Sequence, residues 1–316
     1  MKKIFFFVHI PKTAGTSFRT ALQQNSSVRM LYDYGESSTE TSHELINVAP
    51  QLLKHDNPIF HDDKYNFLCG HVDYHRYGHC VAPSNVISIV RNPVERIVSE
   101  YQHLKRHGGL TASFQEFCSE AVQQNKQWRL LRGLSEASGA LFGLASHYKY
   151  FVELFAEKYS LQLDTISTNI APQSDSEDRF NITPKEIAKA YQLNSKDMAL
   201  FFRLADCFTQ AISAAGYNTA PRAGIKWSSR IVGKRVLGWV SCREVDCFFL
   251  LIRVNGEKKA IISLDQNRSD VQAKGLSEVL MCGFSYPLSL LAADLGDTVS
   301  VEFLGSKNFK IKMSIS

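Results

Sequence analysis

The fold is decided by the stretch IFFFVHIPKTAGTSF, which occupies residues 4–18. Its first half is a run of bulky apolar residues that ends at a proline, which is typical of a short strand buried on both faces. Its second half is small, polar and basic, and a helix-compatible pattern begins at Phe18. The stretch therefore predicts a strand, a tight loop and a helix, in that order.

The loop between this strand and helix has the features of an anion-binding site. A loop that leads into a helix presents unpaired backbone N–H groups at the positive end of the helix dipole. Lys12 adds a positive charge, and the hydroxyl groups of Thr13, Thr16 and Ser17 add hydrogen-bond donors. The alternative is a structural turn in which Lys12 faces solvent. We expect anion binding, because small polar loops after buried strands are often functional.

The order of residues in this loop differs from that of the P-loop of nucleoside triphosphatases. The pattern GxxxxGK[ST] places its lysine directly before the helix and follows it with a hydroxyl group that binds Mg²⁺. Here Lys12 comes first and Gly15 follows it. The loop is therefore P-loop-like, but its order predicts a different anionic ligand.

The composition is that of a globular protein with a mild basic excess. The chain of 316 residues has a net charge of +5 at pH 7, which suits an anionic ligand but does not by itself indicate nucleic-acid binding. Its seven cysteines form no CxxC pair and no zinc-site spacing, which fits free thiols in a reducing compartment. The first apolar run ends at Pro11 without a cleavage site, and no stretch approaches the roughly 20 apolar residues of a membrane span. We therefore expect a cytoplasmic protein without a metal or an integral membrane segment.

The sequence pattern changes near residue 219. Before it, apolar runs such as 85–90 alternate with helical patterns, among them 110–127 and 141–159, which predicts an α/β domain with a parallel sheet flanked by helices. Beyond it, short β-branched and aromatic runs predict a small all-β sandwich. The strongest hairpin signal is Asn255-Gly256 between two such runs. We predict two domains, which span residues 1–218 and 222–316.

Three aromatic residues of the predicted sandwich are candidates for stacking on a sugar ring. They are Trp227, Trp239 and Tyr286. Large aromatic side chains in small sandwiches usually lie in the core. We therefore expect all three to pack inside the domain.

A second basic motif follows the apolar run at 85–90. Arg91 comes at the end of this predicted strand, so it lies at the carboxyl edge of the sheet, where open parallel sheets bind ligands. Arg96 and Ser99 are three residues apart and therefore neighbours on one helix face. A guanidinium and a hydroxyl group near a helix N-terminus can bind a phosphate. The two motifs together suit a nucleotide with phosphate at both ends.

The alternative interpretation gives the two arginines of this motif a structural role. Arg91 and Arg96 would then pair with Glu95, with Glu100 or with helix carbonyl groups. Considered alone, the motif leaves both interpretations open, and the nearby Lys12 loop favours the functional one.

The two motifs together resemble those of sulfotransferases that use 3′-phosphoadenosine 5′-phosphosulfate (PAPS). The resemblance covers most of residues 1–215 and is to the carbohydrate group that includes heparan sulfate 2-O-sulfotransferase and its bacterial relatives. It implies the sulfotransferase fold and assigns the 3′-phosphate of PAPS to Arg91 and Ser99. It assigns the 5′-phosphosulfate to Lys12, Thr13, Ala14, Gly15, Thr16 and Ser17.

The resemblance also implies a catalytic base. In this group, a histidine in a Gly-His-Val-like segment between the two motifs looks like the base, and His71 occupies that position here. His75 and His79 are alternatives, and so is a structural role for His71. Cys69 stands where the 2-O-sulfotransferase group carries a further histidine.

The chemistry of sulfuryl transfer requires these residue types. The reaction needs in-line positioning and stabilisation of the charge on the leaving phosphate, which Lys12 can supply. An imidazole is well matched to accept the proton of an acceptor hydroxyl group. The sequence thus predicts a PAPS-dependent sulfotransferase that acts on a carbohydrate or glycoconjugate, without a nucleic-acid partner. The segments 33–43 and 173–179 are candidates for acceptor selection, and the sequence leaves the oligomeric state open.

Two other functions remain as alternatives. One is an atypical P-loop kinase or NTPase, which the missing GK[ST] motif disfavours. The other is a degenerate nucleotide fold that serves as a scaffold for a glycan-binding β domain.

Overall fold

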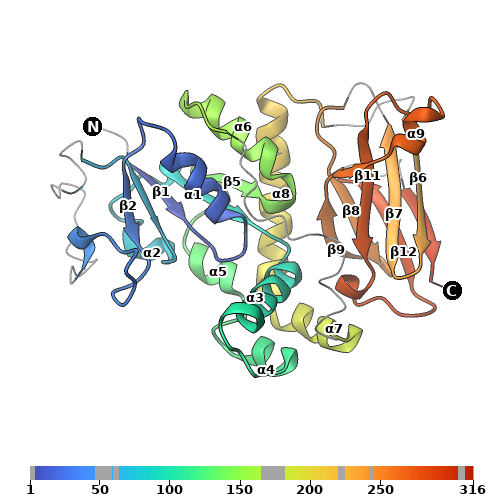
Figure 1. Ribbon diagram of the computed structural model, residues 1–316, viewed down its shortest axis with the longest axis horizontal. Coiled ribbons are helices and arrows are strands. Elements are labelled where there is room, and N and C mark those ends of the chain that lie inside the picture. The colour runs from blue at the N-terminus through green and yellow to red at the C-terminus, as the bar shows by residue number, and fades with distance from the viewer. Residues whose placement is uncertain are drawn as a thin grey trace. The chain divides into compact units, whose positions relative to one another are not determined.

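The computed structural model describes residues 4–46, 59, 64–164, 182–219, 225–241, 245–304 and 310–315 (Figure 1). The chain divides into two compact units. The first comprises Met1–Ala112, Phe117–Ser176 and Leu193–Phe208, and the second comprises Ser113–Glu116, Glu177–Gln192 and Thr209–Ser316. The boundary predicted between 218 and 222 falls largely on residues 220–224, which lie outside the described residues.

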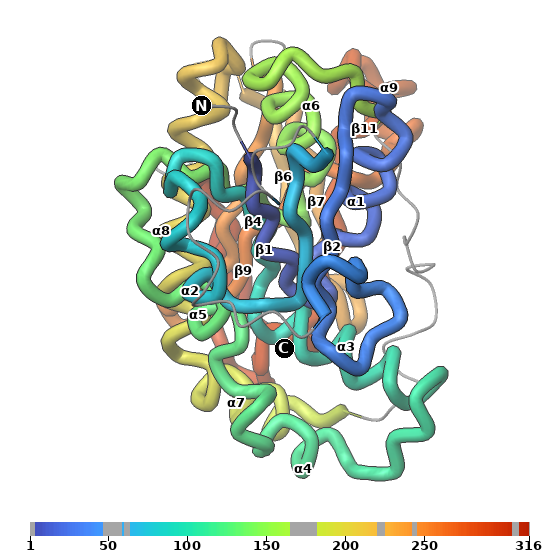
Figure 2. The backbone as a smooth tube through the Cα atoms, turned by 90° about the vertical axis from the view of Figure 1, so that its left-hand side faces the viewer, coloured from blue at the N-terminus to red at the C-terminus, as the bar shows by residue number. Residues whose placement is uncertain are grey.

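The first unit contains a parallel sheet with the strand order β2-β3-β1-β4-β5. In the register of this sheet, Val8 at the end of β1 pairs with Gly70 of β3 and with Ser88 of β4. β1 therefore lies beside β4 in the middle of the sheet (Figure 2). The strands are β1 (Phe5–Val8), β2 (Met30–Asp33), β3 (Phe67–Gly70), β4 (Val86–Val90) and β5 (Leu141–Leu144).

Helices cover both faces of this sheet. Successive residues of a strand point to opposite faces, and in β1 the ring of Phe7 contacts Phe18 of α1 while the ring of Phe6 contacts Tyr77 of α2. Phe18 also contacts Phe151 of α6. The predicted parallel sheet with flanking helices is confirmed. The helices with described residues in this unit are α1 (Gly15–Gln23), α2 (Tyr74–Tyr77), α3 (Pro93–His107), α4 (Phe114–Ser119, of which residues 117–119 belong here), α5 (Lys126–Leu131), α6 (Tyr148–Tyr159) and α8 (Ser195–Ala214, of which residues 195–208 belong here).

Two of the predicted helices are wrong in part. Residues 141–144 form strand β5, because their apolar side chains are buried and their backbone pairs with β4. Gly143 allows this strand to approach α6, since a Cβ atom there would lie 2.3 Å from the Phe151 ring. The segment 110–127 is broken between α4 and α5, where Asn125 takes a left-handed conformation with φ of 49°.

The second unit contains two antiparallel sheets with the orders β10-β11-β7-β6 and β13-β12-β8-β9. Buried residues of both sheets form one apolar core, which includes Val236, Ile252 and Val301. The predicted β-sandwich is thus confirmed. Its strands are β6 (Lys226–Val232), β7 (Arg235–Ser241), β8 (Leu250–Val254), β9 (Glu257–Ile262), β10 (Gln266–Asn267), β11 (Met281–Pro287), β12 (Thr298–Phe303) and β13 (Lys310–Ser314).

The hairpin predicted at Asn255-Gly256 is confirmed. Asn255 and Gly256 both have positive φ, 49° and 88°, between the antiparallel strands β8 and β9, as a tight two-residue turn requires.

The short helix α9 (Ser269–Ala273) precedes β11. Helix α7 (Pro184–Leu193) begins with a capping box in which Glu186 N–H donates to Thr183 Oγ1 and Thr183 N–H donates to Glu186 Oε2.

The core packing expected for three aromatic residues holds for only two of them. Tyr286 is buried in the core, and Trp227 is partly buried against it. Trp239 lies between Gly238 and Val240 on β7, and Val240 points into the core. Because strand side chains alternate, Trp239 points to the opposite face of the sheet, and the expectation for it is wrong.

Replacing Phe18 by alanine tests the packing of α1 against the sheet. Phe18 is fully buried among the aromatic rings of β1 and α6. We expect Phe18→Ala to lower the free energy of unfolding by about 3–5 kcal/mol, as measured by urea denaturation. Val122→Ala, at a side chain that is 56% exposed, should have little effect. An equal loss in both variants would contradict this packing.

Candidate active site

The loop between β1 and α1 has an unusual backbone. Lys12 and Ala14 both have positive φ, 67° and 69°, a conformation that costs a non-glycine residue about 1–3 kcal/mol and is enriched at functional sites. The Thr13 hydroxyl is buried and donates to the Ile10 carbonyl oxygen at 2.9 Å, which fixes the turn. Its hydroxyl hydrogen is therefore engaged within the loop. Of the remaining loop residues, Thr16 is exposed and Ser17 is buried.

Gly15 begins α1 and touches a residue that the sequence analysis did not select, His9. A Cβ atom at position 15 would lie 2.1 Å from His9 Cδ2, so only glycine fits against this imidazole. His9 directly follows β1 and is buried, with its backbone N–H bonded to the Gly70 carbonyl oxygen at 2.9 Å. The signal that could have revealed it is a histidine at the end of an otherwise apolar strand.

The structure brings His71 to this loop. His71 follows β3, the parallel neighbour of β1, and its ring centroid lies 4.4 Å from that of His9 and 4.8 Å from that of Tyr34. The Tyr34 hydroxyl lies 3.0 Å from His9 Nδ1 and 3.4 Å from Cys69 Sγ. We call His9, Tyr34, Cys69 and His71 the histidine cluster.

The surroundings keep both imidazoles of the histidine cluster neutral. Burial and the nearby His71 hold the pKa of His9 well below its ordinary value. Part of the His71 residue is exposed to solvent. Desolvation of the rest, with a contribution from the Arg19 guanidinium, lowers the pKa of His71 to about 4. At neutral pH, His71 therefore carries a free lone pair that can accept a proton.

The segment 33–43 reaches the histidine cluster. Its Tyr34 is a member of the cluster, and its Glu40 forms an ion pair with Arg19 at 2.7 Å. The Arg19 guanidinium lies 5.3 Å from the centroid of the Tyr34 ring. The other candidate segment for acceptor selection, residues 173–179, lies outside the described residues.

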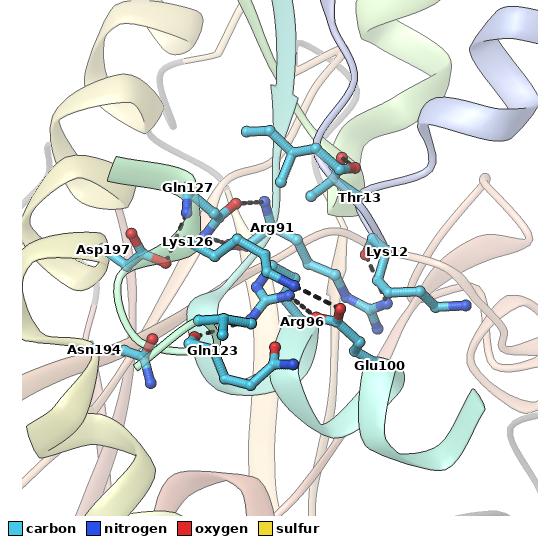
Figure 3. Close-up of polar contacts among 12 residues, drawn as sticks. Lys12, Thr13, Arg91, Arg96, Glu100, Gln123, Lys126, Gln127, Asn194 and Asp197 are labelled. Atoms are coloured by element: carbon cyan, nitrogen blue, oxygen red, sulfur yellow. Dashed lines mark hydrogen bonds and ion pairs between the residues drawn. The ribbon is translucent and has the colours of Figure 1, made fainter. Parts of the chain in front are cut away.

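The second motif meets the first at Arg91 (Figure 3). Arg91 follows β4, and its Nη1 atom lies 3.5 Å from the Lys12 carbonyl oxygen. Burial, and then the charge of Arg91, lower the pKa of Lys12. The two residues that the sequence places in separate motifs are therefore adjacent at one edge of the sheet. Arg91 Nε also donates to Glu95 Oε2 at 3.1 Å, as the structural interpretation expects.

Arg96 has a structural role, as the alternative interpretation holds. Its side chain is completely buried and pairs with Glu100, which also accepts from Lys126 Nζ at 2.6 Å. Burial raises the pKa of Glu100, but Arg96 and Lys126 outweigh this effect and hold it below its ordinary value. Ser99 lies next to Glu100 on α3 and is partly exposed.

Two helices that cap each other hold Arg91 in place. Gln127 of α5 donates to the Arg91 carbonyl oxygen at 2.8 Å and accepts from the Arg91 N–H at 2.9 Å. Asp197 of α8 accepts from the N–H groups of Gln127 and Trp128 at the start of α5. Asn125 Oδ1 in turn accepts from the N–H groups at the start of α8, those of Lys196 and Asp197.

The rival histidine His75 packs against another residue. Its ring lies beside Gly133, where a Cβ atom would lie 2.7 Å from His75 Cε1. Gly133 is not a member of the histidine cluster.

The comparisons with known proteins identify the family. The model of the sulfotransferase family matches residues 2–218, which include both motifs and His71. The chain belongs to the sulfotransferase family. This membership confirms the resemblance to sulfotransferases, which are enzymes that transfer sulfuryl groups. No curated protein matches the sequence significantly.

Two solved sulfotransferases are similar to this chain. A sulfotransferase from Alicyclobacillus acidocaldarius is 16% identical, with a TM-score of 0.36, over 66% of this chain and 97% of that one. Mouse sulfotransferase SULT7A1, in a complex with PAP, is 13% identical, with a TM-score of 0.32, over 61% of this chain and 63% of that one.

Among the residues that the structure describes, no three His, Cys, Asp or Glu side chains are grouped so that they could hold a metal ion. None of the described helices is both long and apolar enough to cross a membrane.

The lowered pKa of His71 predicts a pH dependence of stability. The folded pKa of about 4 lies below that of an unfolded histidine, about 6.5. Protons therefore bind the unfolded chain more tightly, and this contribution to stability is complete above about pH 6.5 and lost as the pH falls towards 4. We expect His71→Asn to lose less unfolding free energy than the native chain over this range. Equal pH slopes in denaturation experiments would show that the pKa of His71 is not lowered.

Proposed function

We propose that the protein transfers a sulfuryl group from PAPS to a hydroxyl group of a carbohydrate or glycoconjugate. The observation that carries the proposal is the position of Arg91, whose guanidinium lies beside the Lys12 backbone. One nucleotide with phosphate groups at both ends can contact two motifs that meet in this way. A member of the sulfotransferase family needs a sulfuryl donor, and such a nucleotide can serve as one.

In this proposal, the two motifs bind opposite ends of PAPS. Arg91 and Ser99 hold the 3′-phosphate. The positive end of the α1 dipole and the charge of Lys12 attract the 5′-phosphosulfate. The residues of the 5′-phosphosulfate loop are Lys12, Thr13, Ala14, Gly15, Thr16 and Ser17.

The chemistry assigned to the site is an in-line displacement. The acceptor oxygen forms a bond to sulfur while the bond between sulfur and the bridging oxygen of the 5′-phosphate breaks. Lys12 stabilises the charge that develops on this oxygen. His71 accepts the proton of the acceptor hydroxyl, and its neutral state at pH 7 makes this possible. The products are a sulfate ester and adenosine 3′,5′-bisphosphate, and no metal takes part.

The buried His9 supports His71 in this role. A charge that develops on His71 during transfer lies next to the His9 ring, which burial keeps neutral. A protonated His9 would repel the proton that His71 must accept.

We further propose a cytoplasmic location, which the free state of the six described cysteines fits.

Transfer assays test the two catalytic residues. With radiolabelled PAPS and a panel of glycans, we expect Lys12→Ala and His71→Ala to lower the turnover rate by about a hundredfold or more. His75→Ala is the matched control, and it should retain most of the activity. If His75→Ala is inactive and His71→Ala is active, the assignment of the base is wrong.

Thermal-shift titration tests the donor separately from the acceptor. Adenosine 3′,5′-bisphosphate should raise the melting temperature without magnesium, since a ligand that binds only the folded state stabilises it. Arg91→Ala should lose most of this shift. Arg29→Ala is the matched control, because Arg29 is exposed and precedes β2, at the opposite end of the strands.

The same titration separates the alternatives. A shift with ATP and magnesium, but none with the bisphosphate, would indicate a kinase or NTPase. No shift with either nucleotide would favour a scaffold protein.

A further inference from the structure

The β10-β11-β7-β6 sheet has a second face, opposite its core, which we call the outer face. On β7 the buried residues Val236 and Val240 belong to the core, so Leu237 and Trp239 point to the outer face. The same alternation places Lys226, Ser228 and Arg230 of β6 on the outer face, and all three are exposed.

The residues directly opposite Trp239 on the two neighbouring strands are small. The register pairs Trp239 with Ser228 on β6 and with Gly283 on β11. The space above Gly283 is filled by the aliphatic part of Arg268, since a Cβ atom at this glycine would lie 2.5 Å from Arg268 Cγ. Within the described part of the chain, no aromatic ring or cation stacks on the Trp239 indole. The Trp239 side chain is partly exposed on the outer face.

Two positive charges lie on the β6 side of this indole. Lys226 and Arg230 lie two residues before and after Ser228, hence diagonally opposite Trp239, at the roughly 7–8 Å that separates such positions. Neither forms an ion pair with a described residue. The outward positions of β6, β7 and β11, strands that are described throughout, include no aspartate or glutamate.

Two arginines near Trp239 donate hydrogen bonds to partners within the unit. Arg235 points to the outer face and donates to Ser285 Oγ at 2.7 Å, a neutral partner on the same face. Arg268 is paired through two hydrogen bonds of 2.7 Å with Asp270. The uncompensated charge of the outer face therefore lies on the β6 side of Trp239.

We propose that the outer face binds an acidic polysaccharide. One sugar ring stacks on the Trp239 indole, and sulfate or carboxylate groups of the same or the next sugar pair with Lys226 and Arg230. Charge complementarity favours an anionic ligand over a neutral one. A nucleic acid fits less well, because single strands use successive aromatic side chains to stack successive bases, and Trp239 is the one aromatic residue among the outward positions of β6, β7 and β11. This binding goes beyond the proposed transfer and does not depend on it.

Binding of dextran sulfate to the full chain tests the proposal. Calorimetric titration is done with saturating adenosine 3′,5′-bisphosphate, which keeps the polymer from the Lys12 and Arg91 motifs, and with neutral dextran as a comparison. We expect dextran sulfate to bind and neutral dextran not to bind. Trp239→Thr leaves the charge of the outer face unchanged and introduces a β-branched residue, which strands favour. It should weaken binding roughly tenfold or more, as the loss of a central aromatic anchor does.

Charge variants complete the experiment. Lys226→Ser with Arg230→Ser should also weaken binding and reduce its dependence on salt. The control is Lys312→Ser, which removes an exposed charge from β13 of the other sheet and should bind like the native chain.

Three results would overturn the proposal. The first is unchanged binding in Trp239→Thr, which would mean that the polymer contacts basic groups without stacking. The second is an equal loss in Lys312→Ser. The third is tighter, Trp239-dependent binding of oligo(dT) than of dextran sulfate. Sulfuryl transfer to a small acceptor should persist in Trp239→Thr, so a failure of the proposed activity is distinguishable from a failure of this binding face.

Discussion

The parallel pairing of β1 with both β3 and β4 is the constraint on which the candidate site depends. Val8 pairs with Gly70 and with Ser88, so three strands end at one edge of the sheet. The residues that follow these ends are His9, His71 and Arg91, from segments far apart in the chain. A one-residue slip of β1 would turn its aromatic side chains to the wrong faces and remove this convergence.

A group of buried charges lies on the helices that surround Arg91. Glu100 lies between the cations Arg96 and Lys126, and removal of one partner of such a buried group leaves a charge that costs several kcal/mol. Asp197 and Asn125 satisfy the first N–H groups of each other's helices. Together these contacts position Gln127, which bonds the backbone of Arg91 at both its N–H and its carbonyl group.

The features that could be predicted from the sequence are those with local signals. The apolar runs of β1 and β4 and the Asn255-Gly256 turn predict their own structure, and both motifs could be placed at the ends of their strands. Features decided by packing could not be predicted. Pairing with β4 makes residues 141–144 a strand, and strand alternation turns Trp239 away from the core. Burial decides between the two interpretations that the sequence leaves open for Arg96. His9 was overlooked because it continues the apolar run of β1, and only the fold reveals its contact with Gly15.

The close approach of His9 and Gly15 links two positions that are six residues apart. A methyl group at 15 has no room unless the imidazole moves or is replaced by a smaller side chain. Homologues with a larger residue at 15 should therefore have a smaller one at 9, and the two positions should covary. The same contact leaves the first turn of α1 without a side chain at the point where it meets the imidazole. An engineer who wishes to reshape the loop has to exchange both residues in one step.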